Sequence, residues 1–286
     1  MRKGILSLAL ILIAAALAYP QQVSFKLAGG LSWINGDDFN AALPGEYNLI
    51  KASALTTSGT FKNLTSGPHF QAELITHISR RIAVGLGGGY YRVSNQSIVA
   101  GSGQTADGPY DATSTFAPQV SVIPFFVNLH YFADLAPKIK IDVYAGPVFS
   151  IVQTHIENPT TSTVLSTSTS EVFTASSISL GGQAGLGFSY RLSSRIFLIA
   201  DGSYHFGKTT DLIGNWVKNV NSSAGFTTSS SDQYYLWTYD YAQGNTYSRI
   251  GFFDVNGPTG DGIANAKKAA IDISGIQLSA GVRISF

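Results

Sequence analysis

The chain has 286 residues, of which 44% are hydrophobic and 12% are charged, and it contains no cysteine, so a disordered chain and a disulfide-built scaffold are excluded. The formal net charge of +1 gives no electrostatic footprint for a nucleic-acid partner. Low charge with 14 tyrosines and 17 phenylalanines favours an apolar exterior, yet beyond the N-terminus no apolar run reaches the length of a membrane helix.

Residues 1–18 have the pattern of a secretory signal peptide. Arg2 and Lys3 supply the positive start, Ile5–Leu17 is a short apolar run, and Ala16-Leu17-Ala18 is a cleavage site of the A-x-A type. The alternative, a retained membrane anchor, is disfavoured because the apolar run is short and ends in small residues. We expect an exported protein whose mature chain begins at Tyr19.

The mature chain contains eight segments in which apolar and polar residues alternate. In Ser177–Leu192 the even positions are apolar apart from Gly182, and the odd positions are polar or glycine. A period of two over sixteen residues predicts a strand with two different faces, longer than globular strands and long enough to cross a bilayer. The eight segments are Val23–Ile34, Gly67–Ile78, Arg81–Val93, Ala117–Phe132, Ile139–Val152, Ser177–Leu192, Arg195–Phe206 and Ile276–Phe286.

One of the eight segments is irregular. In Ala117–Phe132 the apolar residues Val120 and Val122 precede Pro124 in one phase, and Phe125 and Val127 follow it in the other. Proline within a strand is usual at edges and bulges. The sequence therefore predicts a β-bulge at Pro124.

The connections alternate between short and long. Short turns are expected at Ser79–Arg81, Ala133–Lys138 and Ser193–Arg195, and long connections at about 35–65, 94–116, 153–176 and 207–270. We predict an all-β fold in which residues 19–286 form one domain. It is a transmembrane up-and-down antiparallel β-barrel of eight strands, with three short periplasmic turns, four long extracellular loops and both termini in the periplasm.

The inward or outward direction of the side chains also predicts one register, because directly paired residues share a face of the sheet. A three-residue turn at Ser193–Arg195 places Leu192 opposite Ile196. The same register puts Gly187 opposite Asp201 and Gln183 opposite His205.

The C-terminal residues resemble the insertion signal of bacterial outer-membrane barrels. Ser279, Gly281, Ile284 and Phe286 supply the polar residue, the glycine, the hydrophobic residue and the terminal aromatic of that signal. With the signal peptide and the eight strands, the mature chain resembles small barrels of the OmpA-, OmpX- and OmpW-like type. The resemblance implies insertion into the Gram-negative outer membrane among its lipids and lipopolysaccharide. It also implies periplasmic chaperones and the barrel-assembly machinery as transient partners.

Charged residues on the polar faces are expected in the lumen, because a lysine or arginine facing lipid costs about 2–4 kcal/mol. Depth along the strands pairs Lys26 with Glu73, Asp142 with Arg191, and Asp201 with Arg283. An eight-stranded barrel is just wide enough to be filled by side chains, so a lumen plugged by salt bridges is favoured over an ion-selecting conduit. The predicted network comprises Lys26, Glu73, Lys140, Asp142, Arg191, Asp201, His205 and Arg283.

Signals for catalysis or metal binding are weak. Asp201, Ser203 and His205 share one strand face, but residues two apart on a strand do not by themselves make a hydrogen-bonded nucleophile and base. His69 and His77 share a face about 26 Å apart, too far to bind one metal ion. We expect no enzyme and no cofactor, and a lipid-modifying enzyme is a distant alternative.

Residues 254–262 faintly resemble a calcium-binding loop. They carry extra residues between the expected ligands and lack the closing glutamate, so a turn built on Asp and Gly is favoured and calcium binding is left open.

The long loops hold whatever specificity the protein has. Residues 160–177 are rich in serine and threonine and are expected to be solvated and low in complexity. The last loop contains the aromatics Trp216, Tyr234, Tyr235, Trp237, Tyr239 and Tyr241, and Gln233–Tyr241 is predicted to be an added extracellular strand. These aromatics either bind a partner or extend the aromatic girdle of the membrane.

The predicted function is a structural or adhesin-like recognition role at the cell surface, with an extracellular protein or glycan as a candidate ligand. The alternative is a narrow porin-like channel for small or hydrophobic solutes.

Overall fold

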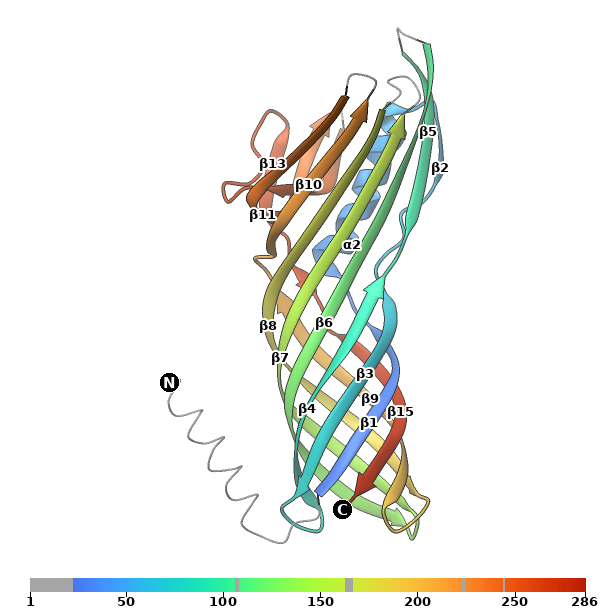
Figure 1. Cartoon of the computed structure of the whole chain (residues 1–286), viewed down its shortest axis with the longest axis vertical. Helices are drawn as coiled ribbons and strands as arrows, with labels where there is room; N and C mark the ends of the chain where they lie inside the picture. The colour runs from blue at the N-terminus through green and yellow to red at the C-terminus, as the bar shows by residue number, and fades with distance from the viewer. Residues whose placement is uncertain (1–22, 106–107, 163–166, 223–224, 244) are drawn as a thin grey trace.

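The computed structural model describes residues 23–105, 108–162, 167–222, 225–243 and 245–286. The predicted signal peptide, residues 1–18, lies outside the described residues. Within them the chain forms fifteen strands and one helix (Figure 1). None of the helical segments in these ranges is both long and apolar enough to span a membrane.

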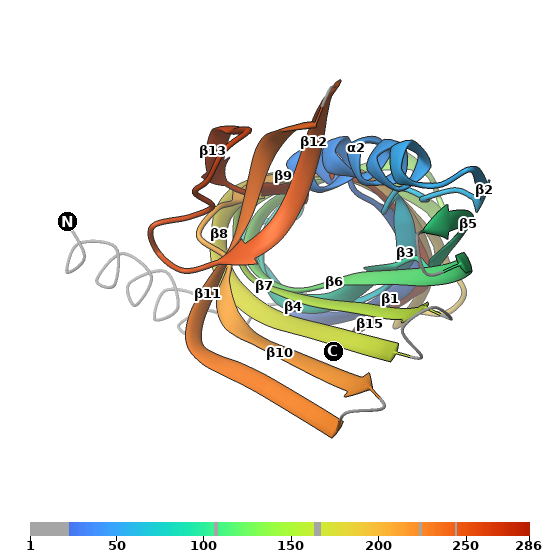
Figure 2. The ribbon, with the colours of Figure 1, turned by 90° about the horizontal axis from the view of Figure 1, so that it is seen from above.

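Eight of the strands form a continuous ring. Each is antiparallel to two ring neighbours, in the order β1, β3, β4, β6, β7, β8, β9, β15, and β15 pairs again with β1 (Figure 2). Every one of the eight predicted segments supplies one of these strands, so the predicted all-β antiparallel fold is confirmed. The ring strands are β1 (Val23–Trp33), β3 (Ser66–His77), β4 (Ile82–Ser94), β6 (Gly108–Ala136), β7 (Ile139–Ser162), β8 (Thr167–Arg191), β9 (Ile196–Thr209) and β15 (Gly275–Ser285).

The total of eight strands was too low, because most of the predicted loop residues are also regular structure. Strands β6, β7 and β8 contain 29, 24 and 25 residues and rise far beyond the rest of the ring as a tall wall (Figure 1). The predicted extra strand Gln233–Tyr241 is confirmed within β11. The further elements are α2 (Asp37–Ser53), β2 (Thr56–Gly59), β5 (Ser97–Thr105), β10 (Ile213–Ser222), β11 (Gly225–Gln243), β12 (Asn245–Phe253), β13 (Ile263–Lys268) and β14 (Ile271–Asp272).

The opposite end of the ring, which we call the turn end, has the short connections that the sequence predicts. The amide of Leu192 donates to the carbonyl of Ile196 at 2.9 Å. The register also matches: Gly187 pairs with Asp201, and Gln183 pairs with His205. The C-terminus lies at this end too, where the amide of Phe286 donates to the carbonyl of Val23 at 2.9 Å (Figure 1).

The predicted bulge at Pro124 is wrong. The pairing of β6 with β7 keeps its register past the proline, from Val122 opposite Val152 to Phe125 opposite Phe149. Val120 and Val122 therefore face the interior, whereas Phe125 faces outward. The apolar phase changes because the interior becomes apolar at this height, and not because the strand slips.

The outer face of the ring toward the turn end is apolar. Its outward side chains are large and exposed, such as Leu129 at 59% and Leu180 at 76%. The alternate residues, which face the lumen, are buried and mostly polar. In a water-soluble domain the polar side chains would face outward, so this arrangement is that of a barrel of the outer-membrane type.

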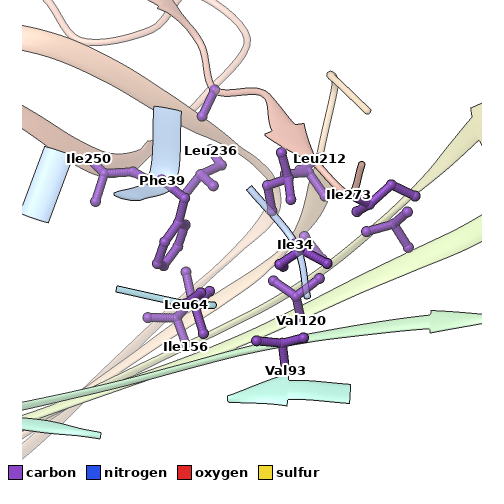
Figure 3. Close-up of a cluster of buried hydrophobic side chains, with 14 of the residues drawn as sticks. Ile34, Phe39, Leu64, Val93, Val120, Ile156, Leu212, Leu236, Ile250 and Ile273 are labelled. Carbon is purple, nitrogen blue, oxygen red and sulfur yellow. The ribbon is translucent and has the colours of Figure 1, made fainter. Parts of the chain in front are cut away.

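The interior above the lumen, which we call the upper core, is an apolar cluster (Figure 3). It combines inward residues of the ring strands with residues of α2 and the segments that follow β9. Its fully or nearly buried members are Ile34, Phe39, Ala42, Leu43, Leu64, Tyr91, Val93, Val120, Val122, Val152, Ile156, Phe173, Ala175, Leu212, Leu236, Ile250, Ala269, Ile271 and Ile273.

Helix α2 closes one side of the upper core (Figure 2). Asp37 and Asp38 occupy its first turn, where acidic side chains interact favourably with the helix dipole. Phe39, Ala42 and Leu43 are buried against the cluster. Gly45 lies so close to β12 that a Cβ atom would stand 1.8 Å from the carbonyl oxygen of Ser248, so the helix docks on that strand only with glycine here.

Candidate functional site

The lumen contains a buried ion pair between Lys26 and Asp201. The Nζ atom of Lys26 lies 3.2 Å from Oδ2 of Asp201, and both side chains are almost fully buried. Tyr144 donates to Oδ1 of Asp201 at 2.9 Å, and its ring lies under the ammonium at 5.0 Å. Lys26 and Glu73 are direct strand partners as predicted, but the lysine reaches past β15 to Asp201 on β9.

A second cluster is centred on His130. Its Nε2 atom lies 2.9 Å from Oε1 of Glu73, and its Nδ1 atom lies 2.9 Å from Oδ1 of Asp142. Two carboxylates facing both ring nitrogens is the hydrogen-bonding pattern of the protonated ring, which donates twice. Asn128 donates to Glu73 at 2.8 Å and accepts from Gln183 at 2.9 Å, so the cluster extends across four strands.

His130 was not among the residues of the predicted network. The alternation that places Leu129 and Tyr131 outward also places His130 inward, so the sequence does indicate its position in the lumen. What the sequence does not give is that its ring reaches both Asp142, on the neighbouring strand β7, and Glu73, on β3 beyond β4.

Arg283 does not pair with Asp201, because its strand partner is Phe197. Its guanidinium lies 4.9 Å from the ring centres of Phe132 and Phe197, and it donates to Ser189 at 3.3 Å. A weakly hydrated guanidinium stacks on aromatic rings more readily than an ammonium does. Arg283 lies in the lumen as predicted, but the prediction that it pairs with Asp201 is wrong.

Lys140 and Arg191 lie outside this network. Lys140 is half-exposed and lies 3.5 Å from Asp134. Arg191 is exposed at the turn end, where it donates to the carbonyl of Pro137. Asp142 pairs with Gly187 and not with Arg191, so the register separates the predicted pair.

His205 faces the lumen above the ion pairs, and its Nε2 atom lies 3.0 Å from the hydroxyl of Tyr91. Ser203 and Asp201 line the same face of β9, as predicted. Asp201 contacts Lys26 and Tyr144, and His205 contacts Tyr91, so each side chain is engaged with a different neighbour.

His69 is buried, and neither of its ring nitrogens has a hydrogen-bond partner among the described residues. It lines a lumen cavity of about 10 Å³ together with Gln71, Tyr91, Gln183 and other neighbours. That volume has room for about one water molecule. The described part of the chain has no group of three metal-ligating side chains that could hold an ion.

Contacts of β13 and of the segment that follows it hold the upper core in place over this lumen. Lys267 lies 2.8 Å from Asp38, and the same carboxylate accepts the amide of Ala270 at 3.1 Å. The amide of Ile273 donates to the carbonyl of Gly207 at 2.9 Å. Helix α2 and residues 269–273 together therefore cover the lumen above His205.

The aromatics of the predicted last loop do not form one surface. The rings of Trp216 and Tyr234 meet edge to face at 5.2 Å. Trp237 donates to the carbonyl of Asp254 at 3.2 Å, and Tyr235 lies under Lys268 at 4.2 Å. The remaining two rings are stacked against one arginine, Arg249, which lies 5.8 Å from the ring of Tyr239 and 5.9 Å from that of Tyr241.

The 254–262 segment contains the predicted turn. Asp254 Oδ1 accepts the amide of Asn256 at 2.8 Å, and Gly257 adopts a positive φ of 77°. Whether it binds calcium stays open.

The residues that resemble an insertion signal lie on the last ring strand. Ser279 and Gly281 face the lumen, and Ile284 and the 73% exposed Phe286 face outward at the turn end. A Cβ atom on Gly281 would stand 2.0 Å from the carbonyl oxygen of Leu27, so the close pairing of β15 with β1 requires glycine.

Comparison with known proteins gives no match to any family model and no match among curated proteins. Solved structures with similar folds include a major outer membrane protein from Thermus thermophilus, with 11% identity and a TM-score of 0.38 over 94% of this chain and 100% of that one. Another is OprG from Pseudomonas aeruginosa, with 13% identity and a TM-score of 0.39 over 92% and 95%. A third is Neisserial surface protein A, with 12% identity and a TM-score of 0.31 over 93% and 97%.

Proposed function

We propose that the chain is an integral bacterial outer-membrane barrel with a closed lumen and a structural or recognition role at the cell surface. The observation that carries the proposal is that the polarity of the inward and outward faces reverses along single strands. In the lower part of β7, Val143 is exposed outward and Asp142 is buried inward, whereas in its upper part Gln153 is exposed outward and Val152 is buried inward. Lipid around the lower part and water around the upper part account for both halves.

The orientation follows from the lengths of the connections. In outer-membrane barrels the periplasmic turns are short and the extracellular loops are long. The turn end, with Val23 and Phe286, accordingly faces the periplasm, and α2 with the tall wall stands outside the cell.

The closed lumen is supported by the pairing of the inward charges. Lys26 and Asp201 pair, and His130 lies between two carboxylates. The lumen cavity holds about 10 Å³, and the upper core covers it. An open, ion-selecting pore needs a continuous path of water, which these contacts oppose.

The proposed partners follow from this location. Outer-membrane lipid and lipopolysaccharide would contact the apolar band, and periplasmic chaperones and the barrel-assembly machinery would act during insertion. The extracellular end would present the surface that meets a protein or glycan ligand.

The test begins with location. We expect the mature protein to fractionate with the outer membrane, to need detergent for extraction, and to be cut at the extracellular end when intact cells are treated with protease. Recovery of freely soluble protein from the periplasm would contradict the proposal.

The second measurement is single-channel conductance of the purified protein in planar bilayers. We expect no steady openings, with a general porin reconstituted in parallel as the positive control. Reproducible openings would favour the alternative of a narrow channel.

The absence of enzymatic activity is part of the same proposal. We expect no hydrolysis of lipid A or phospholipid by the purified protein. Hydrolysis that disappears in Ser203→Ala or His205→Ala would instead assign a lipid-modifying enzyme.

A further inference from the structure

A cavity of about 220 Å³ lies above the membrane part, between the tall wall and the hairpin formed by β11 and β12. It is separate from the small lumen cavity at His69 and His205, and the two share no lining residue. The wall contributes residues of β6, β7 and β8, β10 contributes Trp216, and α2 contributes Leu43. In the proposed orientation this cavity belongs to the extracellular end.

Part of the cavity lining is aromatic. Phe61, Phe116, Trp216 and Phe252 line it. Their positions are fixed by ring contacts, with Phe61 edge-on to Phe116 at 5.8 Å between centres, and Phe252 stacked on Phe173 at 4.0 Å. Rigid aromatic walls of this kind offer a large apolar contact at a small cost in side-chain entropy.

The other lining residues carry hydrogen-bonding groups of both kinds. Asn158, Ser114, Glu171 and Arg249 all line the cavity, and Ser114 donates to Oδ1 of Asn158 at 3.1 Å. The set contains acceptors in the carboxylate and amide oxygens and donors in the guanidinium and amide N–H groups. The indole nitrogen of Trp216 is buried with no hydrogen-bond partner among the described residues, which is rare for a native donor.

The charges lining the cavity balance. Glu171, which pairs with Lys218 at 2.8 Å, and Arg249 line the cavity with opposite signs. A ligand with a net charge would be attracted by one of these groups and repelled by the other. The cavity therefore favours a neutral molecule with one apolar face and many hydroxyl groups.

We propose that this cavity binds an uncharged sugar ring of the pyranose type. The C–H face of such a ring packs against aromatic side chains. Its hydroxyls donate to and accept from the polar residues of the lining. The volume is somewhat below the range of about 300–1,000 Å³ for drug-sized ligands, which suits one sugar ring at the end of a glycan. The inference rests on the proposed function, because only an end exposed to the surroundings meets glycans.

A fatty acyl chain is the competing occupant. The lining includes the charged or polar residues Ser114, Asn158, Glu171 and Arg249, and an alkyl chain would displace water from these groups and offer them no hydrogen bond in return. The cavity also lies above the apolar outer band, where the strands present polar residues such as Gln153 outward. The acyl chain is therefore kept as an outcome of the test.

The test uses the full-length mature protein in detergent and measures tryptophan fluorescence. The chain has three tryptophans, at positions 33, 216 and 237. The double variant Trp33→Phe with Trp237→Phe retains Trp216 as the reporter. The probes are methyl glucoside, methyl galactoside and N-acetylglucosamine as neutral sugars, with glucuronate, glucosamine and decanoate as charged and acyl comparisons.

We expect at least one neutral sugar to change the emission of Trp216 in a saturable manner, and the charged sugars and decanoate to have no effect. Asn158→Ala is expected to weaken the affinity about fivefold to tenfold, since it removes hydrogen-bonding groups. Trp216→Ala, measured by calorimetry, should weaken it at least about tenfold. Trp237→Ala is the matched control, because Trp237 does not line the cavity, and it should bind as the native protein does.

Each other outcome overturns the inference. These are no response to any neutral sugar, a response only to a charged sugar or decanoate, or sugar binding that Asn158→Ala and Trp216→Ala leave unchanged. A mobility difference between heated and unheated samples on gels, together with protease resistance of the native and variant proteins, shows that each is folded. Membrane fractionation and conductance are measured separately, so failure of sugar binding in a surface-exposed, non-conducting barrel refutes this inference alone.

Discussion

The same strands enclose two different interiors. Near the turn end the lumen contains Lys26, Asp201, Glu73 and His130 in buried ion pairs. Farther along the same strands, the interior is the apolar upper core. The strand alternation does not change between the two regions, and only the chemistry of each face does.

The difference teaches that burial is defined by the solvent outside. Lipid excludes polar side chains from the lower outer face, so the polar groups turn inward and must pair. Water surrounds the upper part, so apolar side chains turn inward and pack as they do in any soluble domain. Residues such as Ser150 and Val152, two apart on β7 and both inward, mark the boundary.

The largest effect is expected from breaking the lower interior at its ion pair. Asp201→Ala leaves the ammonium of Lys26 buried without its partner, and losing one member of a buried pair costs about 3–5 kcal/mol. Urea unfolding in detergent, followed by gel mobility without heating, measures the change.

The matched control for this prediction replaces both members. Lys26→Met with Asp201→Leu removes the two charges together, and a well-packed apolar replacement is often neutral or stabilising. We expect it to regain most of the lost stability. If the double variant is as unstable as Asp201→Ala, the pairing is not the cause.

The outer face gives the next largest effect. Val143→Arg places a cation in the apolar band of β7, and a lipid-facing arginine costs about 2–4 kcal/mol near the midplane. Gln153→Arg makes a comparable change on the same strand above the boundary and should cost less than about 0.5 kcal/mol. The two variants are compared by their yield of folded barrel in lipid vesicles. Equal yields would show that no lipid boundary lies between the two positions.

Much of the barrel is predictable from the sequence, because strand alternation is local. The eight ring strands, the turn at Ser193–Arg195 and the inward position of Asp201 all follow from a period of two. These features need no knowledge of what lies across the lumen.

The pairings could not be predicted, because they join residues that are not direct strand partners, on neighbouring or next-but-one strands. Lys26 has Glu73 as its strand partner but binds Asp201, and Asp142 binds His130 and not Arg191. Depth on adjacent strands ignores the long reach of a lysine side chain and the tilt of strands in a barrel.

The bulge at Pro124 was predicted wrongly for a different physical reason. The apolar phase was assumed to mark one face throughout Ala117–Phe132. That assumption holds only while the outside solvent is constant, and under the proposed function the strand passes from lipid to water at this point. The same change accounts for the strands and helix in the predicted loops, since the upper core gives them an apolar interior to pack against.

A smaller effect comes from exchanging polarity within the upper interior. Val152→Thr buries a hydroxyl in the apolar core and is expected to cost about 1–3 kcal/mol. Thr154→Val is the reciprocal change, and because the hydroxyl makes only a long 3.5 Å contact with the carbonyl of Ala175, we expect little loss or a small gain. Hydrogen exchange of the residues around the upper core measures both, and a destabilising Thr154→Val with a neutral Val152→Thr would mean that the interior there is polar.

The smallest effect is a loosening of the upper end of the molecule in acid. The hydrogen bond from Lys268 lowers the pKa of Asp211 below its ordinary value near 3.8. Burial opposes the ionisation of Asp272, but the hydrogen bonds from Ser274 and Asn35 outweigh it, so the pKa of that carboxyl is lowered too. Because the unfolded segments bind these protons more readily, the stabilisation is present above about pH 4 and is lost as the pH falls through the lowered pKa values.

Hydrogen exchange of residues 263–273 at pH 6 and at about pH 3 measures the effect. The comparison uses protection factors, which divide out the slower intrinsic exchange of amides in acid. We expect smaller protection factors at the lower pH, and Asp211→Asn should reduce the difference by removing one of the two carboxyls. Equal protection factors at both pH values would show that the upper core alone, without these carboxylates, holds the segment in place.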